Sequence, residues 1–215
     1  MEVMTAVEIK AFLQRMATLV QEQKDELTQL DSVIGDGDLG LTMTKGFTAI
    51  AESVETLEEE DVGKLLAKAG MVIASAAPST MGTLMATGLM RGGKAVQGKS
   101  QINLTDLAAL FQAFVGGIMD RGKAKPGDKT VLDALYPAAM ALQSAADAEK
   151  SLAEGIQEAF QAACDGLEQT KKLISQHGKA ACFQEKTLGH QDPGATVGML
   201  LFKALATMEV SHGIN

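Results

Sequence analysis

Aromatic residues, prolines and cysteines are scarce in this chain of 215 residues. Trp is absent, Tyr occurs once, and the aromatic share is 4%, whereas 46% of the residues are hydrophobic. Ala, Leu and Met are abundant instead, and they are strong helix formers. We therefore expect an aliphatic, helical core. The length lies within the range of one domain, so residues 1–215 are predicted to form a single domain.

Further absences limit the partners and the compartment. The chain has no basic run and a net charge of −8, which argues against nucleic acid and against an anionic membrane surface. It has no run of about 18 apolar residues and no basic segment followed by an apolar one at its start, so neither a transmembrane helix nor a signal peptide is expected. Cys164 and Cys182 lack metal-type spacing, which favours a reduced, cytoplasmic protein.

Hydrophobic residues recur at helical spacing, and no segment shows sustained strand alternation. This pattern predicts an all-α fold of eight helices around one core. The expected helices cover residues 9–30, 41–50, 62–72, 84–90, 104–119, 131–142, 152–174 and 195–208.

Four connections between these helices combine Gly with Asp or hydroxyl residues. They are residues 31–40, 77–83, 121–130 and 178–194. Helices that alternate in direction bring every second connection to the same end of a bundle. These loops are the first, third, fifth and seventh connections, so we expect all four to share one rim.

The first of these loops, Asp31-Ser-Val-Ile-Gly-Asp-Gly-Asp-Leu-Gly40, holds three carboxylates within eight residues. Its glycines reach positive φ at little cost, so the side chains of Asp31, Asp36 and Asp38 can converge. Converged carboxylates repel one another unless a cation lies between them, and hard oxygen ligands suit Mg²⁺ or Ca²⁺. A solvated Asp-Gly turn is the simpler alternative. The packed helices on both sides favour the cation site.

The other three loops could bind an anion or only cap a helix. Loop 121–130 carries four basic residues before a helix expected to open at Thr130, which could itself be the N-cap. The hydroxyls of Ser79 and Thr80 could cradle a phosphate or cap the next helix. Asp192 fits an N-cap before Pro193, while the backbone N–H groups that follow could face a phosphate or an adenine edge.

Other catalytic signatures are missing. His190 is interpreted as a structural histidine, and no Ser-His-Asp or Cys-His arrangement is evident. There is no Walker A motif and no dinucleotide fingerprint. A nucleotide site would therefore have to depend on a metal and on helix termini.

Three motifs, in this order, resemble the ADP-binding L subunits of phosphotransferase-dependent dihydroxyacetone kinases and the matching C-terminal domain of the ATP-dependent kinases. The motifs are Ile34-Gly-Asp-Gly-Asp38, Arg121-Gly-Lys-Ala with Pro126-Gly-Asp-Lys-Thr130, and Gly189-His-Gln-Asp-Pro-Gly-Ala195. The resemblance covers nearly the whole chain. It implies an antiparallel eight-helix barrel with the nucleotide at one rim.

The resemblance also implies residue roles and partners. Asp31, Asp36 and Asp38 would hold two Mg²⁺ ions that bind the nucleotide phosphates, and no catalytic residue is expected on this chain. ADP would be a retained cofactor, rephosphorylated by a phosphohistidine M subunit, and a K subunit would hold the ketone. A homodimer is a further option. The implied nucleotide-binding residues are Leu39, Gly40, Leu41, Thr42, Ser79, Thr80, Met81, Gly122, Thr130, Val131, Lys179, Asp192, Pro193 and Gly194.

The sequence departs from the family pattern around the expected nucleotide. Leu39 and Thr42 replace a usual His and Asn, Ala76-Ala-Pro-Ser-Thr80 replaces a Gly-Ala-Ser-Gly-Pro loop, and Lys179 replaces an Arg. Lys keeps the charge but lacks the bidentate fork of Arg. Two alternatives therefore stay open: half of an ATP-dependent ketose kinase, or a non-catalytic regulatory paralogue that binds metal or nucleotide.

Overall fold

The computed structural model describes residues 2–208. In this range, nine α-helices and two short 3-10 helices accompany one pair of two-residue strands. The elements are β1 (Met4–Thr5), α1 (Ala6–Glu22), α2 (Lys24–Ile34), α3 (Leu39–Glu55), α4 (Val62–Ala76), α5 (Thr80–Ala95), β2 (Gln101–Ile102), α6 (Leu104–Gly122), α7 (Leu132–Asp147), α8 (Leu152–Gln169), η1 (Thr170–Lys172), η2 (Lys179–Thr187) and α9 (Pro193–Thr207).

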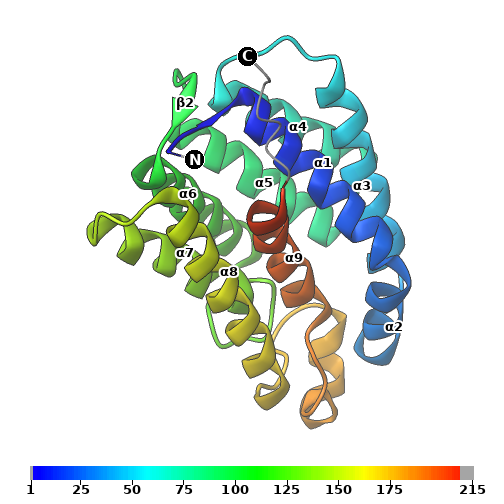
Figure 1. The fold of residues 1–215 in the computed structure, drawn as a ribbon. Helices are drawn as coiled ribbons and strands as arrows, with labels where there is room; N and C mark the ends of the chain where they lie inside the picture. Colours follow the sequence, from blue (N-terminus) through cyan, green and yellow to red (C-terminus); the bar gives the residue numbers. More distant parts are fainter. Residues whose placement is uncertain (1, 209–215) are drawn as a thin grey trace.

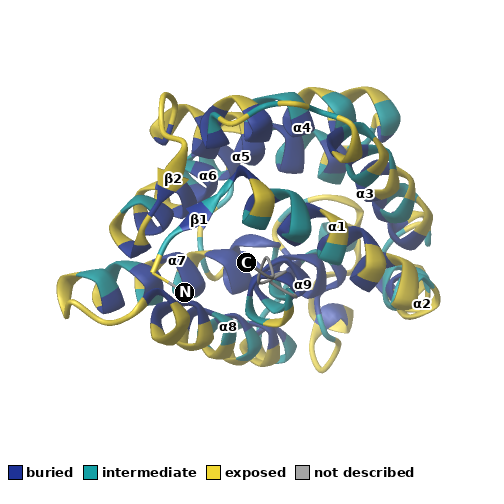
Figure 2. Cartoon of the chain, turned by 45° about the horizontal axis from the view of Figure 1, so that its top comes forward, coloured by how far each residue is buried: buried dark blue, intermediate teal, exposed yellow. Residues whose placement is uncertain are grey.

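Eight of the helices close into a ring in chain order (Figures 1 and 2). Helix α1 packs on α3, each helix from α3 to α8 packs on the next one, and α9 returns to α1. Helix α2 stands outside this ring and contacts α3. The predicted all-α antiparallel barrel is therefore confirmed. Among residues 2–208, no helix combines the length and apolar character needed to cross a bilayer.

Apolar side chains fill the inside of the ring. Phe111 is buried there, and its ring centroid lies 5.8 Å from that of Phe114 and 4.6 Å from that of Phe202. Helices α1, α4, α5, α6 and α9 supply leucines and phenylalanines around a residual cavity of about 10 Å³. That volume is at the limit for a single water molecule. The barrel is thus a packed core, as Figure 2 shows by its dark interior, and ligand chemistry must occur elsewhere.

Two predicted helices end earlier than expected. The helix expected over 9–30 is divided at Gln23, whose φ of −100° and ψ of 10° are not helical. No Gly or Pro marks this break, and α2 leaves the ring there to pack on α3. Helix α2 then continues to Ile34, so Asp31 lies on a helix rather than in a loop. The helix expected over 152–174 ends at Gln169, and η1 follows it.

The strand pair β1–β2 was not expected from the sequence. It pairs Met4 with Ile102 and Thr5 with Gln101 in antiparallel register. Two residues per strand are too few for a period of two to be visible in a sequence. The pair joins the start of the chain to the segment before α6, at the end of the barrel opposite α2 (Figure 1).

Substitution of Gly63 should test how closely α4 and α5 pack. A Cβ atom at Gly63 would lie 2.4 Å from the carbonyl oxygen of Gly93 and 2.5 Å from Cα of Gln97. We expect Gly63→Ala to lower the free energy of unfolding by about 1–3 kcal/mol, because backbone cannot move aside as a flexible side chain can. Urea unfolding followed by circular dichroism measures the change.

Gly116→Ala is the matched control, because a Cβ at this position in α6 meets nothing within 4 Å. Helix propensity alone should make that variant neutral or more stable by up to about 1 kcal/mol. Equal stability of the two variants would contradict the close contact between α4 and α5.

Candidate functional site

Three carboxylates converge at the α2–α3 junction. Asp31 lies in the last turn of α2, Asp36 lies in the connection, and Asp38 directly precedes α3. One carboxylate oxygen of each residue lies within 4.8 Å of those of the other two. This convergence matches the geometry expected from the Asp-Gly pattern, and three oxygen donors so close together suit a hard divalent cation.

The glycines of this junction make the convergence sterically feasible. A Cβ at Gly35 would lie 2.1 Å from Oδ1 of Asp31, so any other residue would displace that carboxylate. Gly37 has a φ of +74°, a conformation that favours glycine, and its missing Cβ leaves room for the hydroxyl of Ser32. The residues present therefore fit a cation held by the three carboxylates.

Two contacts hold the carboxylates of Asp31 and Asp36 in place. The backbone N–H of Leu39 donates to Oδ2 of Asp31 across 3.2 Å. The ammonium of Lys179, at the start of η2, forms an ion pair with Asp36. Among residues 2–208, this is the ion pair that reaches the cluster, and it links segments 143 residues apart in the sequence.

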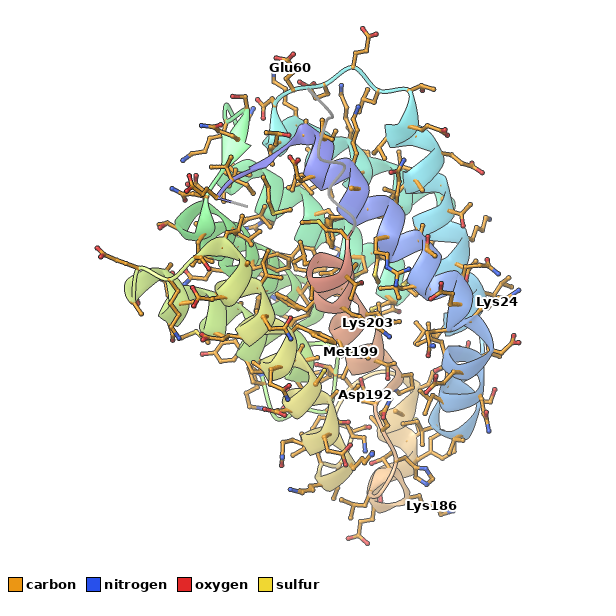
Figure 3. The ribbon with its side chains drawn as sticks, viewed as in Figure 1. Lys24, Glu60, Lys186, Asp192, Met199 and Lys203 are labelled. Carbon is orange, nitrogen blue, oxygen red and sulfur yellow. The ribbon has the colours of Figure 1, made fainter. Side chains whose placement is uncertain are left out.

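The cluster forms one side of a pocket of about 430 Å³. All four loops expected at one rim contribute to its lining, which confirms the argument from alternating helix direction. The side chains that line it lie at the end of the barrel where α2, η2 and the start of α9 meet (Figure 3, where Asp192 is labelled).

Four helices begin at this pocket. Leu39 opens α3, Thr80 opens α5, Val131 directly precedes α7, and Pro193 opens α9, and all four residues line the pocket. Helix N-termini carry partial positive charge and unpaired N–H groups, so they favour an anion. The pocket thus faces a ligand with an acidic cluster on one side and positive helix ends on several others.

Most of the residues implied by the resemblance line this pocket. Eleven of the fourteen proposed nucleotide-binding residues do so, as do the three aspartates. Gly40, Leu41 and Gly122 are absent from the lining. Gly40 instead permits close packing of α3 on α2, since a Cβ there would lie 2.2 Å from the Lys24 carbonyl oxygen. Leu41 is exposed, and a Cβ atom at Gly122 would lie 3.3 Å from Cδ2 of Leu84.

Two of the pocket residues cap helices, as one of the alternatives expected. The Ser79 side chain accepts from the Gly82 N–H, and Asp192 accepts from the Ala195 N–H, so both cap a helix while lining the pocket. Pro193 stands in the first turn of α9, as predicted. Helix α7 begins at Leu132 rather than Thr130, because the Asp133 side chain holds the preceding turn by accepting from the N–H groups of Thr130 and Gly127.

The basic loop 121–130 differs from the expected anion site. Arg121, Lys123 and Lys125 are exposed and do not line the pocket. Lys129 does line it, but this residue is only 2% exposed and its ammonium donates to backbone carbonyls. The positive character of the pocket therefore comes from helix ends, Lys129 and Lys179 rather than from a cluster of four cations.

Lys129 and Asp192 are buried charges that affect each other. Burial lowers the pKa of Lys129, and the nearby carboxylates of Asp192 and Asp133 act in the opposite direction. Burial raises the pKa of Asp192 to about 7, and the Ala195 N–H bond only partly offsets this. Asp192 therefore changes charge near neutral pH within the pocket lining.

One further pair beside the pocket was not predicted from the sequence. His177 lines it, and Nε2 of His177 lies 3.0 Å from Oδ2 of Asp128. Burial disfavours the charged form of Asp128, but hydrogen bonds from Lys125 and His177 outweigh it and lower the pKa of Asp128 to about 2. Asp128 and His177 are 49 residues apart, so no local spacing could have joined them.

The family model described as the DAK2 domain matches residues 33–207. The chain belongs to the DAK2 domain family. This membership agrees with the resemblance found in the sequence motifs.

Several relatives of this DAK2 chain are similar over nearly its whole length. It is 31% identical over 203 residues to the PEP-dependent dihydroxyacetone kinase ADP-binding subunit DhaL of Escherichia coli, which covers 94% of this chain and 97% of the relative. A DhaL subunit of Listeria innocua is 32% identical over 195 residues, 90% of each chain. An L-erythrulose kinase of Pectobacterium atrosepticum is 32% identical, and there the chain spans only 34% of the relative.

Solved structures share this DAK2 fold. The dihydroxyacetone kinase of C. freundii in its native form matches with a TM-score of 0.75 and 26% identity. The same enzyme in complex with AMP-PNP and Mg²⁺ matches with a TM-score of 0.73 and 27% identity. Each match covers 94% of this chain and 34% of the kinase chain.

The residues at which the resemblance implied departures from the family pattern lie in the pocket itself. Leu39, Thr42, Pro78 and Lys179 all belong to its lining. Leu39 is buried and apolar, so it offers a ligand only its backbone N–H, which Asp31 already accepts. The three carboxylates converge, while the residues expected to depart from the family pattern lie beside them in the same pocket.

Asp192→Asn should change how stability depends on pH. Because the folded-state pKa of Asp192 is raised to about 7 from 3.8, its contribution to stability is present at low pH and is lost as pH rises toward 7. Asn keeps the N-cap without titrating. The stability of wild type relative to Asp192→Asn should therefore fall between about pH 4 and 7, by at most about 1.4 kcal/mol per pH unit.

Urea unfolding of both proteins at several pH values measures this difference. Carboxylates with lowered pKa, such as Asp128, are common to both proteins and cancel in the comparison. A difference that stays constant from pH 4 to pH 8 would show that Asp192 is ionised in the folded protein throughout.

Proposed function

We propose that this chain is the nucleotide-carrying subunit of a short-chain ketose kinase. It binds ADP with Mg²⁺, receives a phosphoryl group from a phosphohistidine M subunit, and delivers it to dihydroxyacetone or a similar ketose held by a K subunit. The observation that carries the proposal is the convergence of Asp31, Asp36 and Asp38 at a pocket where four helices begin. The names of the similar DhaL subunits support the substrate class.

The residues of the pocket suit phosphoryl transfer. Such transfer depends on positioning and on charge stabilisation more than on covalent help from the protein. When bound, Mg²⁺ supplies that charge stabilisation by neutralising phosphate oxygens. Asp31, Asp36 and Asp38 would hold the cation, and the resemblance to the DhaL subunits implies two such ions. The oxygens of the three side chains already converge, and Gly35 leaves room for the Asp31 carboxylate.

The remaining sides of the pocket would hold the nucleotide. The first turns of α5 and α9 present backbone N–H groups beside Thr80 and Gly194, which suits phosphate oxygens. Met81 and Leu84 give an apolar wall suited to a flat base. Lys179 adds a positive charge next to the carboxylate cluster.

A nucleotide that exchanges freely is the second candidate. It is favoured by the L-erythrulose kinase relative, in which a region similar to this chain is one part of a longer protein. Mass spectrometry of an extract of the purified protein, combined with metal analysis, separates the two. Retained ADP supports the subunit role, and an empty protein that binds ATP with Mg²⁺ supports free exchange. Calorimetry that detects neither ADP nor ATP binding in Mg²⁺ would overturn both.

Asp36→Ala tests the carboxylate cluster. The variant should lose Mg²⁺-dependent ADP binding while its helical circular dichroism stays unchanged, because the Asp36 side chain is more than a third exposed and packs no core. Asp25→Ala, an exposed aspartate in the first turn of α2, is the matched control and should bind as wild type. Loss of helical signal in Asp36→Ala would instead show that the cluster is structural.

Lys179→Gln tests the charge balance of the cluster. The Lys179 ammonium and a divalent cation compete for the Asp36 carboxylate, so its removal should tighten Mg²⁺ binding in the absence of nucleotide, by up to roughly fivefold. The same variant should weaken ADP binding, since a positive charge beside the phosphates is lost. Calorimetry with Mg²⁺ alone and with ADP measures both effects.

The matched control is Lys186→Gln. Lys186 belongs to the same 3-10 helix but is exposed at the outer end of the molecule (Figure 3). It should bind Mg²⁺ and ADP as wild type does. Weaker Mg²⁺ binding in Lys179→Gln would mean that the lysine supports the cation site rather than competing with it.

A further inference from the structure

Residues 173–190 lie between η1 and α9 and carry four pocket residues, among them His177 and Lys179. The segment has no long helix of its own. Its regular structure is the 3-10 helix η2, which is interrupted at Gln184 by a positive φ of 48°. Something other than local helix formation must therefore fix its position.

The neighbouring residue Lys129 supplies much of that fixation. Its Nζ donates to the carbonyl oxygens of Leu173 at 3.2 Å and His190 at 2.8 Å, and also to that of Thr187. An ammonium has three N–H donors, so these three carbonyls satisfy it completely. The bonds reach both ends of the 173–190 segment from one buried atom.

Asp128 adds attachments in the middle of the segment. Its backbone carbonyl accepts from the Gln176 N–H at 3.0 Å, and its carboxylate contacts Nε2 of His177. The carboxylate is itself fixed by the backbone N–H of Lys125 at 2.9 Å and by Nζ of Lys125 at 2.7 Å. Two adjacent residues thus contact 173–190 at five points.

The turn that carries Asp128 and Lys129 has an unusual backbone conformation. Lys129 has a φ of 58°, which a residue with a side chain seldom adopts. The Asp133 side chain holds this turn through the N–H groups of Gly127 and Thr130. A strained backbone that is held from both sides suits a residue whose side chain must reach one particular place.

We propose that Asp128 and Lys129 form an anchor that holds residues 173–190 beside the pocket, and that they act as positioning residues for ligand binding through His177 and Lys179. The proposal rests on the proposed function, in that it takes the pocket as the nucleotide site. It assigns to Lys129 a role through the segment it holds, in place of the anion contact expected from the basic loop.

Lys129→Met is the principal test. Methionine keeps a long side chain but leaves three carbonyls without a donor, and hydrogen bonds from charged groups are costly to lose. Hydrogen exchange of the protein without nucleotide should show amides of 173–190 exchanging roughly tenfold faster or more, with protection of the ring helices retained. ADP affinity in Mg²⁺ should fall roughly tenfold or more. Affinity for Mg²⁺ alone should stay unchanged or rise.

Lys123→Met is the matched control. Lys123 lies in the same loop and shares the positive φ, at 54°, but it is exposed and outside the pocket lining. It should exchange and bind as wild type does. Equal protection of 173–190 in the two variants would overturn the proposal. So would a uniform rise in exchange across all helices of Lys129→Met, because that result would mean a general loss of stability.

His177→Ala provides a second test if Lys129→Met fails to fold. The imidazole is partly exposed, so its removal spares the core while cutting one of the five attachments. Faster exchange near residues 175–180 in the absence of ligand is expected, and unchanged exchange there would contradict the anchor. These measurements need no nucleotide. Failure of the wild type to bind ADP or ATP would therefore refute the proposed function and still leave the anchor to be decided by exchange.

Discussion

Closure of eight helices into a ring in chain order is the constraint on which the site depends. Helices α3 to α8 each pack on the next helix, and α9 returns to α1. Because neighbouring helices run in opposite directions, every second connection lies at the same end. That end therefore collects the starts of α3, α5, α7 and α9 together with the loops before them. Since apolar side chains fill the ring, the rim is the place left for a ligand.

Negative and positive groups face each other across the pocket at this rim. Three carboxylates at the α2–α3 junction repel one another, and four helix N-termini and two lysines stand around the same pocket. The two lysines have different roles. Lys179 forms a solvent-exposed ion pair with Asp36, whereas the buried ammonium of Lys129 donates to backbone carbonyls. A polyanionic ligand that carries its own divalent cation complements both sides of this arrangement.

The fold and the carboxylate cluster were predictable because their signals are local. Helical periodicity indicates the ring helices, and the Asp-Gly spacing between two packed helices predicts that Asp36 and Asp38 converge with Asp31. What escaped prediction depends on residues far apart in sequence. The break at Gln23 has no Gly or Pro to announce it. The sequence predicts Lys129 only as one of four cations in its loop. Its buried role was not predicted, because the carbonyls that it contacts are 44 to 61 residues away in the sequence.

The strand pair β1–β2 ties the start of the chain to the end of the barrel that is remote from the pocket (Figure 1). Helix α9 begins at the pocket and also runs toward that remote end. For work at the bench, an affinity tag or a surface tether placed before Met4 therefore leaves the ligand rim facing free solution. An immobilised protein would present its pocket, and any protein that docks there, without obstruction.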